Sequence, residues 1–391
     1  MFKFRSFLSV NFLSALLLYY FTGPYFVWNL PAKIYLDILL QLIVGIVFIR
    51  RMKVLTKSDQ LIVFLYVAVW VLYMFQLYNS GRNLFGLIQH VPICLLFSIF
   101  FCKRDFGEKV LNNYVNIYTS FILISMTVWM VSSFVDFPSL GTLQHFGEAE
   151  RQYSVFPFLV KENLSVDSFR FYGLFDEPGV VGTTGAILLC ILRFNFKDKR
   201  TWVLMLSGLL SMSFFFYSTV AIYSVLYLSL VKKNIPYTIL LIIIISAFYY
   251  ITCDNPIMSE VIWSRFEWDP ETQQFVGDNR IDDRSVEYFD KIRWTSEYFW
   301  GMNNIEQYWR FAQGSSSYLN VIAMYGAVFF FAYCLFFVVF SFKYRANVMS
   351  FVLFCFIFLL NMYQRTNIYS TLWVFLYAIF ARGIIIEKQR E

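Results

Sequence analysis

The sequence predicts an all-α polytopic membrane protein with about 12 transmembrane helices, because apolar segments long enough to cross a bilayer recur along it. Of its 391 residues, 59% are apolar, 21% are aromatic and only 15% are charged. An ordinary soluble protein has about 25% charged residues, and a soluble fold of this length cannot bury so much apolar surface. The composition therefore excludes a cytosolic enzyme, a disulfide scaffold and a disordered chain. Nucleic acid is not an expected partner, because no basic cluster alternates with aromatic residues.

The stretch 201–231 is too long for one upright helix. Its small polar residues, which include Ser207-Gly208 and Ser218-Thr219, suit a broken helix packed inside protein. We therefore expect two short helices there, and one long tilted helix is the alternative. The expected spans are 8–28, 31–49, 60–78, 84–102, 114–135, 172–194, 201–215, 217–231, 235–252, 318–341, 347–364 and 367–386.

Positive charge predicts that both termini lie inside. The inner segments then carry 20 of the 32 Lys and Arg residues, and the short outer turns carry only Lys33, Arg82 and Arg365. A single helix over 201–231 would move Lys232 and Lys233 outside. The charge distribution therefore also favours the broken pair.

Two long outer loops, 136–171 and 253–317, interrupt the short connections. Long loops in compact proteins are usually functional or disordered, and the aromatic content of the second loop argues against disorder. Within it, residues 280–300 show apolar residues at helical spacing, which predicts an amphipathic helix on the outer membrane surface. A solvated cap over the bundle is the alternative. No linker divides the chain, so residues 1–391 are expected to form a single membrane domain.

Charged residues stand where the span after the first loop begins: Arg170, Asp176 and Glu177. Charges at membrane depth are costly and often mark function. A helix N-terminus beside an Arg is also a suitable seat for a phosphate group. The structural alternative is that Arg170 snorkels to the surface and that the two carboxylates cap the helix.

This segment resembles the Wzy-type O-antigen and polysaccharide polymerases, which are relatives of the O-antigen ligases. The shared pattern is Arg-x-x-Gly-x-Phe-x-Glu-Pro-x-x-x-Gly. The matching residues are Arg170, Gly173, Phe175, Glu177, Pro178 and Gly182. The family also has a broken span pair rich in Ser and Gly, then a large loop with scattered arginines, then a small polar stretch that leads into a span. Here these features match 207–219, 253–317 and 314–320, and Gly326 follows.

One departure separates the polymerases from the ligases. Ser315 stands where the ligases carry a His, and 253–317 contains no His. Arg310 and Gly326 fit an Arg–Gly spacing that some polymerases show. The resemblance therefore implies a polymerase, and the ligase stays an alternative. A lipid-linked oligosaccharide flippase, a non-enzyme transporter, is disfavoured because the mid-span regions are nearly free of charge.

The resemblance implies a GT-C-like glycosyltransferase in the bacterial inner membrane whose site faces the periplasm. Its substrates would be oligosaccharides on undecaprenyl diphosphate, and a chain-length-determining co-polymerase would be a partner. No cofactor or metal is expected. Arg170 is the expected diphosphate ligand, Glu177 the general base and Asp176 the second candidate base. The remaining substrate-binding candidates are Arg265, Arg280, Arg284, Arg293, Arg310, Tyr318 and Asn320.

Overall fold

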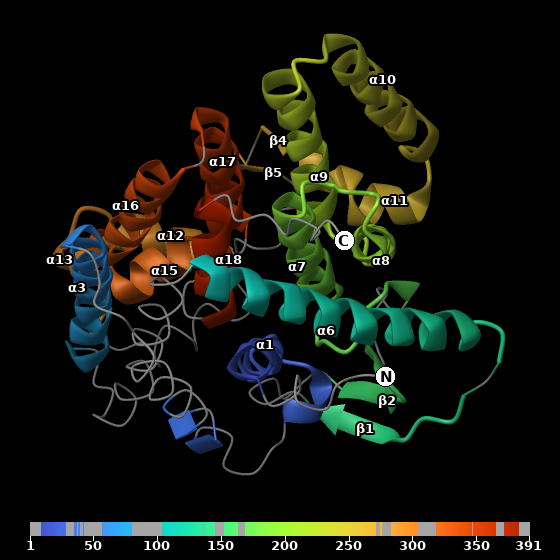
Figure 1. Cartoon of the computed structure of the whole chain (residues 1–391), viewed down its shortest axis with the longest axis horizontal. Coiled ribbons are helices and arrows are strands. Elements are labelled where there is room, and N and C mark those ends of the chain that lie inside the picture. Colours follow the sequence, from blue (N-terminus) through green and yellow to red (C-terminus); the bar gives the residue numbers. More distant parts are fainter. Residues whose placement is uncertain are drawn as a thin grey trace. The chain divides into compact units, whose positions relative to one another are not determined.

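The structure is a computed structural model that describes most of the chain (Figure 1). The described residues are 9–28, 35–36, 38–39, 42, 57–79, 104–135, 137–144, 152–162, 169–270, 274–275, 283–303, 318–345, 347–364 and 371–382. They are mostly helical. Within them, three helices are long and apolar enough to cross a membrane, at Phe106–Val131, Ile235–Thr252 and Ala327–Tyr344, which is consistent with a membrane protein. The expected span 84–102 and most of 31–49 lie outside the described residues.

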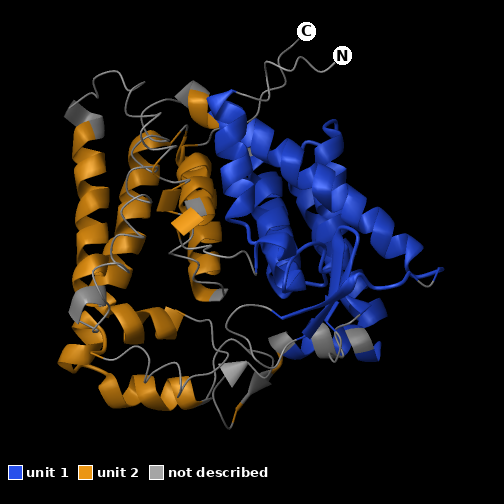
Figure 2. Ribbon diagram, turned by 90° about the horizontal axis from the view of Figure 1, so that it is seen from below, with its two compact units in different colours: residues 1–33, 108–266, 384–391 blue, residues 34–107, 267–383 orange. Residues whose placement is uncertain are grey.

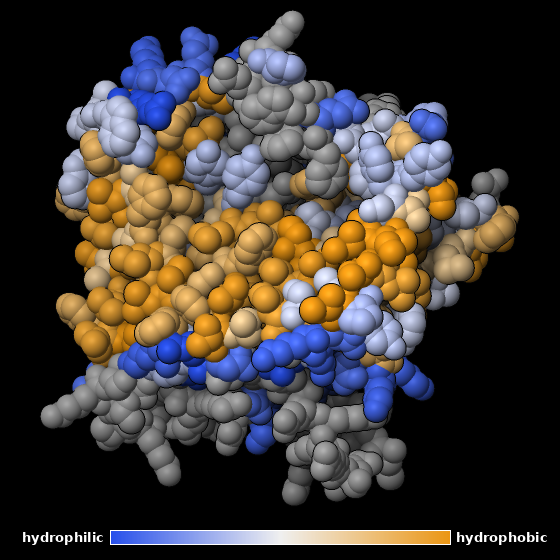
Figure 3. All heavy atoms as spheres, turned by 90° about the horizontal axis from the view of Figure 1, so that it is seen from above, coloured by the Kyte–Doolittle hydropathy of each residue, from blue (hydrophilic) through white to orange (hydrophobic). Residues whose placement is uncertain are grey.

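The chain divides into two compact units (Figure 2). Unit 1 comprises 1–33, 108–266 and 384–391, and unit 2 comprises 34–107 and 267–383. The single membrane domain stays a prediction. On the face drawn in Figure 3, hydrophobic side chains gather in a broad zone that hydrophilic side chains border.

Unit 1 is built around α7, which packs against both α8 and α9. Its α-helices are α1 (Val10–Tyr20), α6 (Arg104–Val131), α7 (Pro178–Ile191), α8 (Lys199–Leu210), α9 (Phe214–Leu226), α10 (Ile235–Thr252) and α11 (Pro256–Val261). Shorter turns are η2 (Tyr25–Val27), the π-helical η4 (Tyr227–Val231) that continues α9, and η5 (Trp263–Phe266).

Two expected spans of unit 1 are shorter than predicted. Helix α1 ends at Tyr20, whereas the sequence predicts a helix over 8–28. A turn over Thr22 and Gly23, where Gly23 has φ +78°, and then Pro24 stop it. Helix α7 begins at Pro178, whereas the prediction begins at 172, because the preceding residues are held in irregular backbone.

The broken pair over 201–231 is confirmed, and its break lies at 211–213. There Met212 adopts φ +47°, a left-handed conformation that a helix cannot continue through. The 12-residue α8 is about 18 Å long, which is shorter than the hydrocarbon core of about 30 Å. Helix α8 therefore ends at Leu210, five residues before the expected bound, and the number of membrane spans stays a prediction.

The first long loop contains a three-stranded antiparallel sheet that the all-α prediction missed. Its strands are β1 (Gly141–Gln144), β2 (Gln152–Phe156) and β3 (Leu159–Glu162), in the order β1-β2-β3. Tyr153 and Val155 alternate with more exposed residues along β2 and are buried against Trp28 and Tyr172. This two-residue period is the sequence signal for the strand.

In unit 2, α16 packs against α3, α17 and α18. The α-helices of this unit are α3 (Lys57–Asn79), α12 (Asp283–Ile292), α13 (Ser296–Trp300), α15 (Tyr318–Tyr325), α16 (Ala327–Tyr344), α17 (Val348–Gln364) and α18 (Thr371–Ala381). A two-stranded sheet pairs β4 (Trp268–Asp269) with β5 (Gln274–Phe275). In the core, the Phe358 ring contacts the rings of Tyr333 and Tyr377, and the Phe337 ring also contacts Tyr377.

The helix expected over 280–300 is two helices, α12 and α13. Trp294, with φ +64°, lies between them. Helix α12 is amphipathic as predicted, since Ser285 and Ile292 are buried while Glu287 and Asp290 are exposed. Its seat on the outer membrane surface stays a prediction.

The span expected over 318–341 is broken at Gly326, which has φ +87° and separates α15 from α16. A Cβ atom on Gly326 would overlap the carbonyl oxygen of Phe299. Gly301 has φ +82°, and a Cβ atom there would lie 2.6 Å from the carbonyl oxygen of Met324. Two backbones therefore touch directly where the end of α13 and the residues after it cross the helix break.

Hydrogen bonds fix this crossing. The Met302 N–H donates to the Ala323 carbonyl at 3.0 Å. The buried side chain of Gln76, on α3, donates from Nε2 to the Met302 carbonyl, also at 3.0 Å. Three segments that lie far apart in the sequence therefore meet at Met302.

We expect Gly326→Ala to destabilise the protein strongly. The substitution adds the cost of a left-handed alanine, about 1–3 kcal/mol, and a collision with the Phe299 carbonyl. Gly23→Ala is the matched control, because Gly23 also has positive φ but has nothing within 4 Å of its Cβ position. Unfolding in mild detergent titrated with dodecyl sulfate measures both. Equal losses in the two variants would contradict the crossing.

Candidate functional site

The motif segment 170–177 is buried irregular backbone that leads from the sheet to α7. Residues 170–175 are all buried. The Phe171 N–H donates to the Leu210 carbonyl at 3.0 Å, the Gly173 carbonyl accepts from Val160 at 3.0 Å, and the Leu174 carbonyl accepts from Tyr25 at 2.7 Å. Residues of α8, β3 and η2 thus hold the segment in place.

Side chains of the motif segment also contact neighbouring elements, namely α6 and β3. The Phe175 ring stacks on Tyr118 of α6, with ring centroids 6.2 Å apart. The Tyr172 hydroxyl donates to Glu162 Oε2 at 3.1 Å. Gly173 has φ +63°, and this left-handed turn is the conformation for which the pattern needs glycine.

Arg170 caps the carboxyl end of α8. Its side chain is only 7% exposed. Nε donates to the Ser211 carbonyl at 3.0 Å, and one terminal nitrogen, Nη2, donates to the Met212 carbonyl at 3.1 Å. A cation at this end also interacts favourably with the partial negative charge of the helix C-terminus. Arg170 therefore does not snorkel to the surface, and the sequence-based alternative is wrong in that respect.

The last two carbonyls of α8 itself also have donors. Leu209 accepts from the hydroxyl of Tyr217 at 2.9 Å, and Leu210 accepts from the Phe171 N–H. The last carbonyls of a helix have no partners within the helix. Arg170, Phe171 and Tyr217 together supply those partners at an end that lies inside the protein.

Glu177 is the residue that precedes α7, and its backbone is extended, with φ −134° and ψ 140°. Its side chain makes no capping hydrogen bond, so the expectation that it caps the helix is wrong. Pro178 instead begins the helix with a preset φ. The side chains of Asp176 and Glu177 are half-buried at this helix start.

Gly182 is the point where α7 meets the α8–α9 break. A Cβ atom on Gly182 would overlap Ser213 Cβ and would lie 2.8 Å from Ser211 Oγ. A Cβ atom on Gly185, the next glycine of the same helix, would lie 3.5 Å from its nearest neighbour, the Leu204 carbonyl oxygen. The last glycine of the motif is therefore required by close packing against the break that Arg170 caps.

The motif residues Arg170, Gly173, Asp176, Glu177, Pro178 and Gly182 thus come together in unit 1. Arg265 lies in η5 of the same unit. Arg280 and Arg310 lie outside the described residues. The remaining candidates, Arg284, Arg293, Tyr318, Asn320 and Gly326, belong to unit 2.

Within unit 2 these candidates have different surroundings. Arg284 and Arg293 are exposed. The Tyr318 ring stacks with Tyr363, with centroids 5.8 Å apart, and Asn320 is buried on α15. These two residues have the burial expected of interhelical contacts.

Sequence reasoning missed the residues that receive or complete these contacts: Ser211, Met212, Tyr217, Gln76 and Gly301. Only the small-residue run around Ser211 signalled the break that they surround. In the part of the chain that the structure describes, no group of three or more His, Cys, Asp or Glu side chains is arranged to hold a metal ion. Comparison with models of protein families, with curated proteins and with solved structures finds no match.

We expect Arg170→Met to lower the free energy of unfolding by about 2–6 kcal/mol, because it leaves the Ser211 and Met212 carbonyls without this donor and each such loss costs about 1–3 kcal/mol. Arg170→Lys should recover only part of this loss, since one ammonium does not reproduce the planar fork. Arg284→Met, at an exposed arginine, should change stability by less than about 0.5 kcal/mol. Dodecyl sulfate titration of the purified variants is the measurement. An Arg170→Met protein as stable as Arg284→Met would refute the cap.

Gly182→Ala should separate α7 from the break, whereas Gly185→Ala should be tolerated. Both changes add one methyl group to the same helix, and only the first meets an immediate overlap. The rate at which a thiol reagent modifies a cysteine introduced near the break measures local opening. Dodecyl sulfate titration measures the global free energy of unfolding. Equal behaviour of the two alanines would show that contact at Gly182 is not tight.

Proposed function

We propose that the chain is an O-antigen polymerase, a glycosyltransferase that joins undecaprenyl-diphosphate-linked repeat units at the periplasmic face of the inner membrane. The observation that carries the proposal is the pattern from Arg170 to Gly182, with the arrangement of its residues. A buried cation and two half-buried carboxylates belong to one fixed segment at the start of an apolar helix. Such an arrangement is costly to maintain unless it has a use.

The reaction needs a base and a cation. A hydroxyl of the acceptor sugar attacks the anomeric carbon of the donor, and the bond from that carbon to the diphosphate breaks. The lipid diphosphate leaves with the electron pair, and the base takes the hydroxyl proton. We assign the base to Glu177, the half-buried carboxylate that directly precedes α7, and keep Asp176 as the second candidate.

The proposal gives Arg170 two tasks. Nε and Nη2 hold the carbonyls of Ser211 and Met212 at the end of α8. Its positive charge, fixed in a water-poor region, would stabilise the charge that develops on the leaving diphosphate. The proposed second cation is Arg265, the candidate arginine that belongs to the same unit. The ligase remains disfavoured by Ser315.

Surface glycan length tests the assignment. A strain that lacks the gene is complemented with wild type, Glu177→Gln or Glu287→Gln at matched protein levels, and glycan ladders are compared on gels. Glu287 is the control because it is an exposed carboxylate on α12. Wild type and Glu287→Gln should restore the ladder, and Glu177→Gln should leave one repeat unit on the lipid A core. Loss of the general base is expected to cost about 10²–10⁴-fold in rate.

Two outcomes would overturn this proposal. A deletion strain with no repeat unit on the core would point to the ligase or the flippase. A full ladder from Glu177→Gln would remove Glu177 from the reaction.

A further inference from the structure

A continuous line of five aromatic rings connects the α7–α8 turn with the end of α9. Trp202 lies 5.0 Å from Phe196, and Phe196 lies 6.5 Å from Phe194. Phe194 lies 5.4 Å from Tyr223, which stacks on Tyr227 at 5.8 Å, all measured between ring centroids. The contact between Phe194 and Tyr223 therefore joins residues 194–202 to residues 223–227.

Hydrogen bonds hold this line in place. The indole Nε1 of Trp202 donates to the Phe196 carbonyl at 3.0 Å, and the Tyr223 hydroxyl donates to the Cys190 carbonyl at 3.1 Å. Trp202 is nevertheless 52% exposed and Phe196 is 45% exposed. Exposed aromatic side chains with a fixed orientation are typical of the membrane–water boundary, where an amphipathic ring is most favourably placed.

Five cations accompany the rings. They are Arg193, Lys197, Lys199, Lys232 and Lys233. Lys232 Nζ lies 5.7 Å from the centroid of the Tyr227 ring, which is the last ring of the line. Lys232 and Lys233 therefore follow the rings at that end. We call the five rings and five cations together the aromatic–basic rim.

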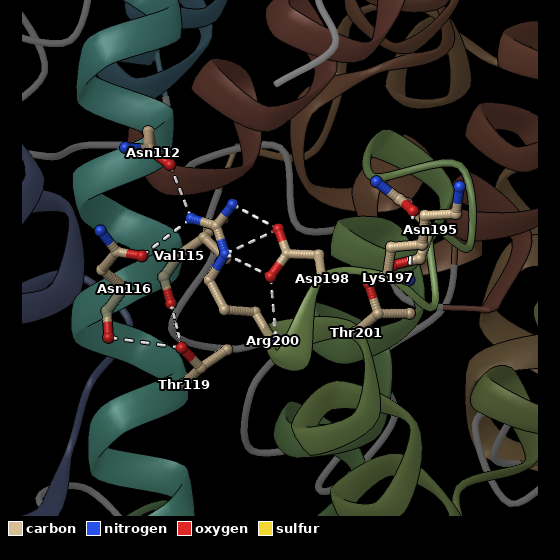
Figure 4. A network of polar contacts seen from close by, with 9 residues as sticks. All are labelled: Asn112, Val115, Asn116, Thr119, Asn195, Lys197, Asp198, Arg200 and Thr201. Carbon is tan, nitrogen blue, oxygen red and sulfur yellow. Dashed lines mark hydrogen bonds and ion pairs between the residues drawn. The ribbon is translucent and has the colours of Figure 1, made fainter. Parts of the chain in front are cut away.

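The rim has a strong net positive charge. Asp198 is the one acidic residue in 193–233. Arg200 contacts it through an ion pair of 2.5 Å and also donates to the side-chain oxygens of Asn112 and Asn116 at 2.6 and 2.8 Å (Figure 4). Because Arg200 neutralises Asp198, the charge of the five rim cations is not offset.

The rim also lies next to apolar surface. Lys232 and Lys233 come directly before α10, an 18-residue apolar helix on which only Thr238 is buried. A long apolar helix that is exposed along nearly its whole length is suited to lipid acyl chains. We therefore expect the N-terminus of α10, which lies beside the lysines, to be at the boundary between lipid acyl chains and headgroups.

We propose that the aromatic–basic rim binds the phosphate groups of anionic glycerophospholipids, with Phe196 and Trp202 inserted at the level of the glycerol backbone. Lysine ammonium groups provide charge for the phosphates, and the two exposed rings provide contact with the upper acyl chains. The net charge selects anionic over zwitterionic lipids. This interaction surface is separate from the motif segment and does not depend on the proposed function.

Lipid retention by the purified full-length protein tests the rim. The protein is solubilised in detergent with equal amounts of phosphatidylglycerol and phosphatidylcholine, and bound lipids are counted by native mass spectrometry. Wild type should retain phosphatidylglycerol preferentially, and about 1 M salt should abolish the preference by screening. Lys197→Gln with Lys199→Gln should weaken retention about 30-fold, since each cation near an anionic surface contributes about 1 kcal/mol, which is about fivefold.

Three variants make the result specific. Lys197→Arg with Lys199→Arg keeps the charge and should retain phosphatidylglycerol. Trp202→Ala should reduce the retention of both lipids. Lys161→Gln with Lys291→Gln removes the same charge from the two long loops that the charge distribution places on the outer side, and should behave as wild type. Equal retention of the two lipids by wild type, or equal losses in the two double glutamine variants, would overturn the proposal.

Discussion

A helix that ends inside a protein must find donors for its last carbonyl groups, and the end of α8 is such a place. The Phe171 N–H bonds the last carbonyl of the helix, that of Leu210, and the Arg170 guanidinium bonds the next two carbonyls, those of Ser211 and Met212. The same segment pairs with the sheet through Gly173 and leads into α7 at Pro178. The positions of the sheet, of α7 and of the half-buried carboxylates therefore all depend on how this one helix end is satisfied.

Both units use glycine where an irregular segment crosses a helix. In unit 1, Gly182 lets α7 approach the α8–α9 break, and in unit 2, Gly301 and Gly326 let a loop end touch the α15–α16 break. A close approach of this kind fixes the backbone without a large side chain. The glycines of the motif thus have structural causes, since Gly182 is needed for close packing and Gly173 for its left-handed backbone, whereas the proposed chemistry requires Glu177.

The sequence predicted elements whose cause is local. A uniform apolar run gave α10 with its observed bounds, and the serines around Ser211 indicated the broken pair. The acceptors of Arg170, by contrast, lie 41 and 42 residues away. The break at Gly326 follows from its contact with Phe299, which no periodicity records. The sheet at 141–162 consists of strands of four or five residues, too short for their alternation to stand out within a long loop.

Hydrogen exchange in detergent tests the dependence on Arg170 most directly. Amide exchange is compared between wild type and Arg170→Met for peptides that cover 207–217, with α17 as an internal reference in unit 2. Loss of the cap should speed exchange over 207–217 by about ten- to a hundredfold, which corresponds to about 1.4–2.8 kcal/mol of local opening, and should leave α17 unchanged. Unchanged exchange over 207–217 would contradict the account, because the end of α8 would then hold without its arginine.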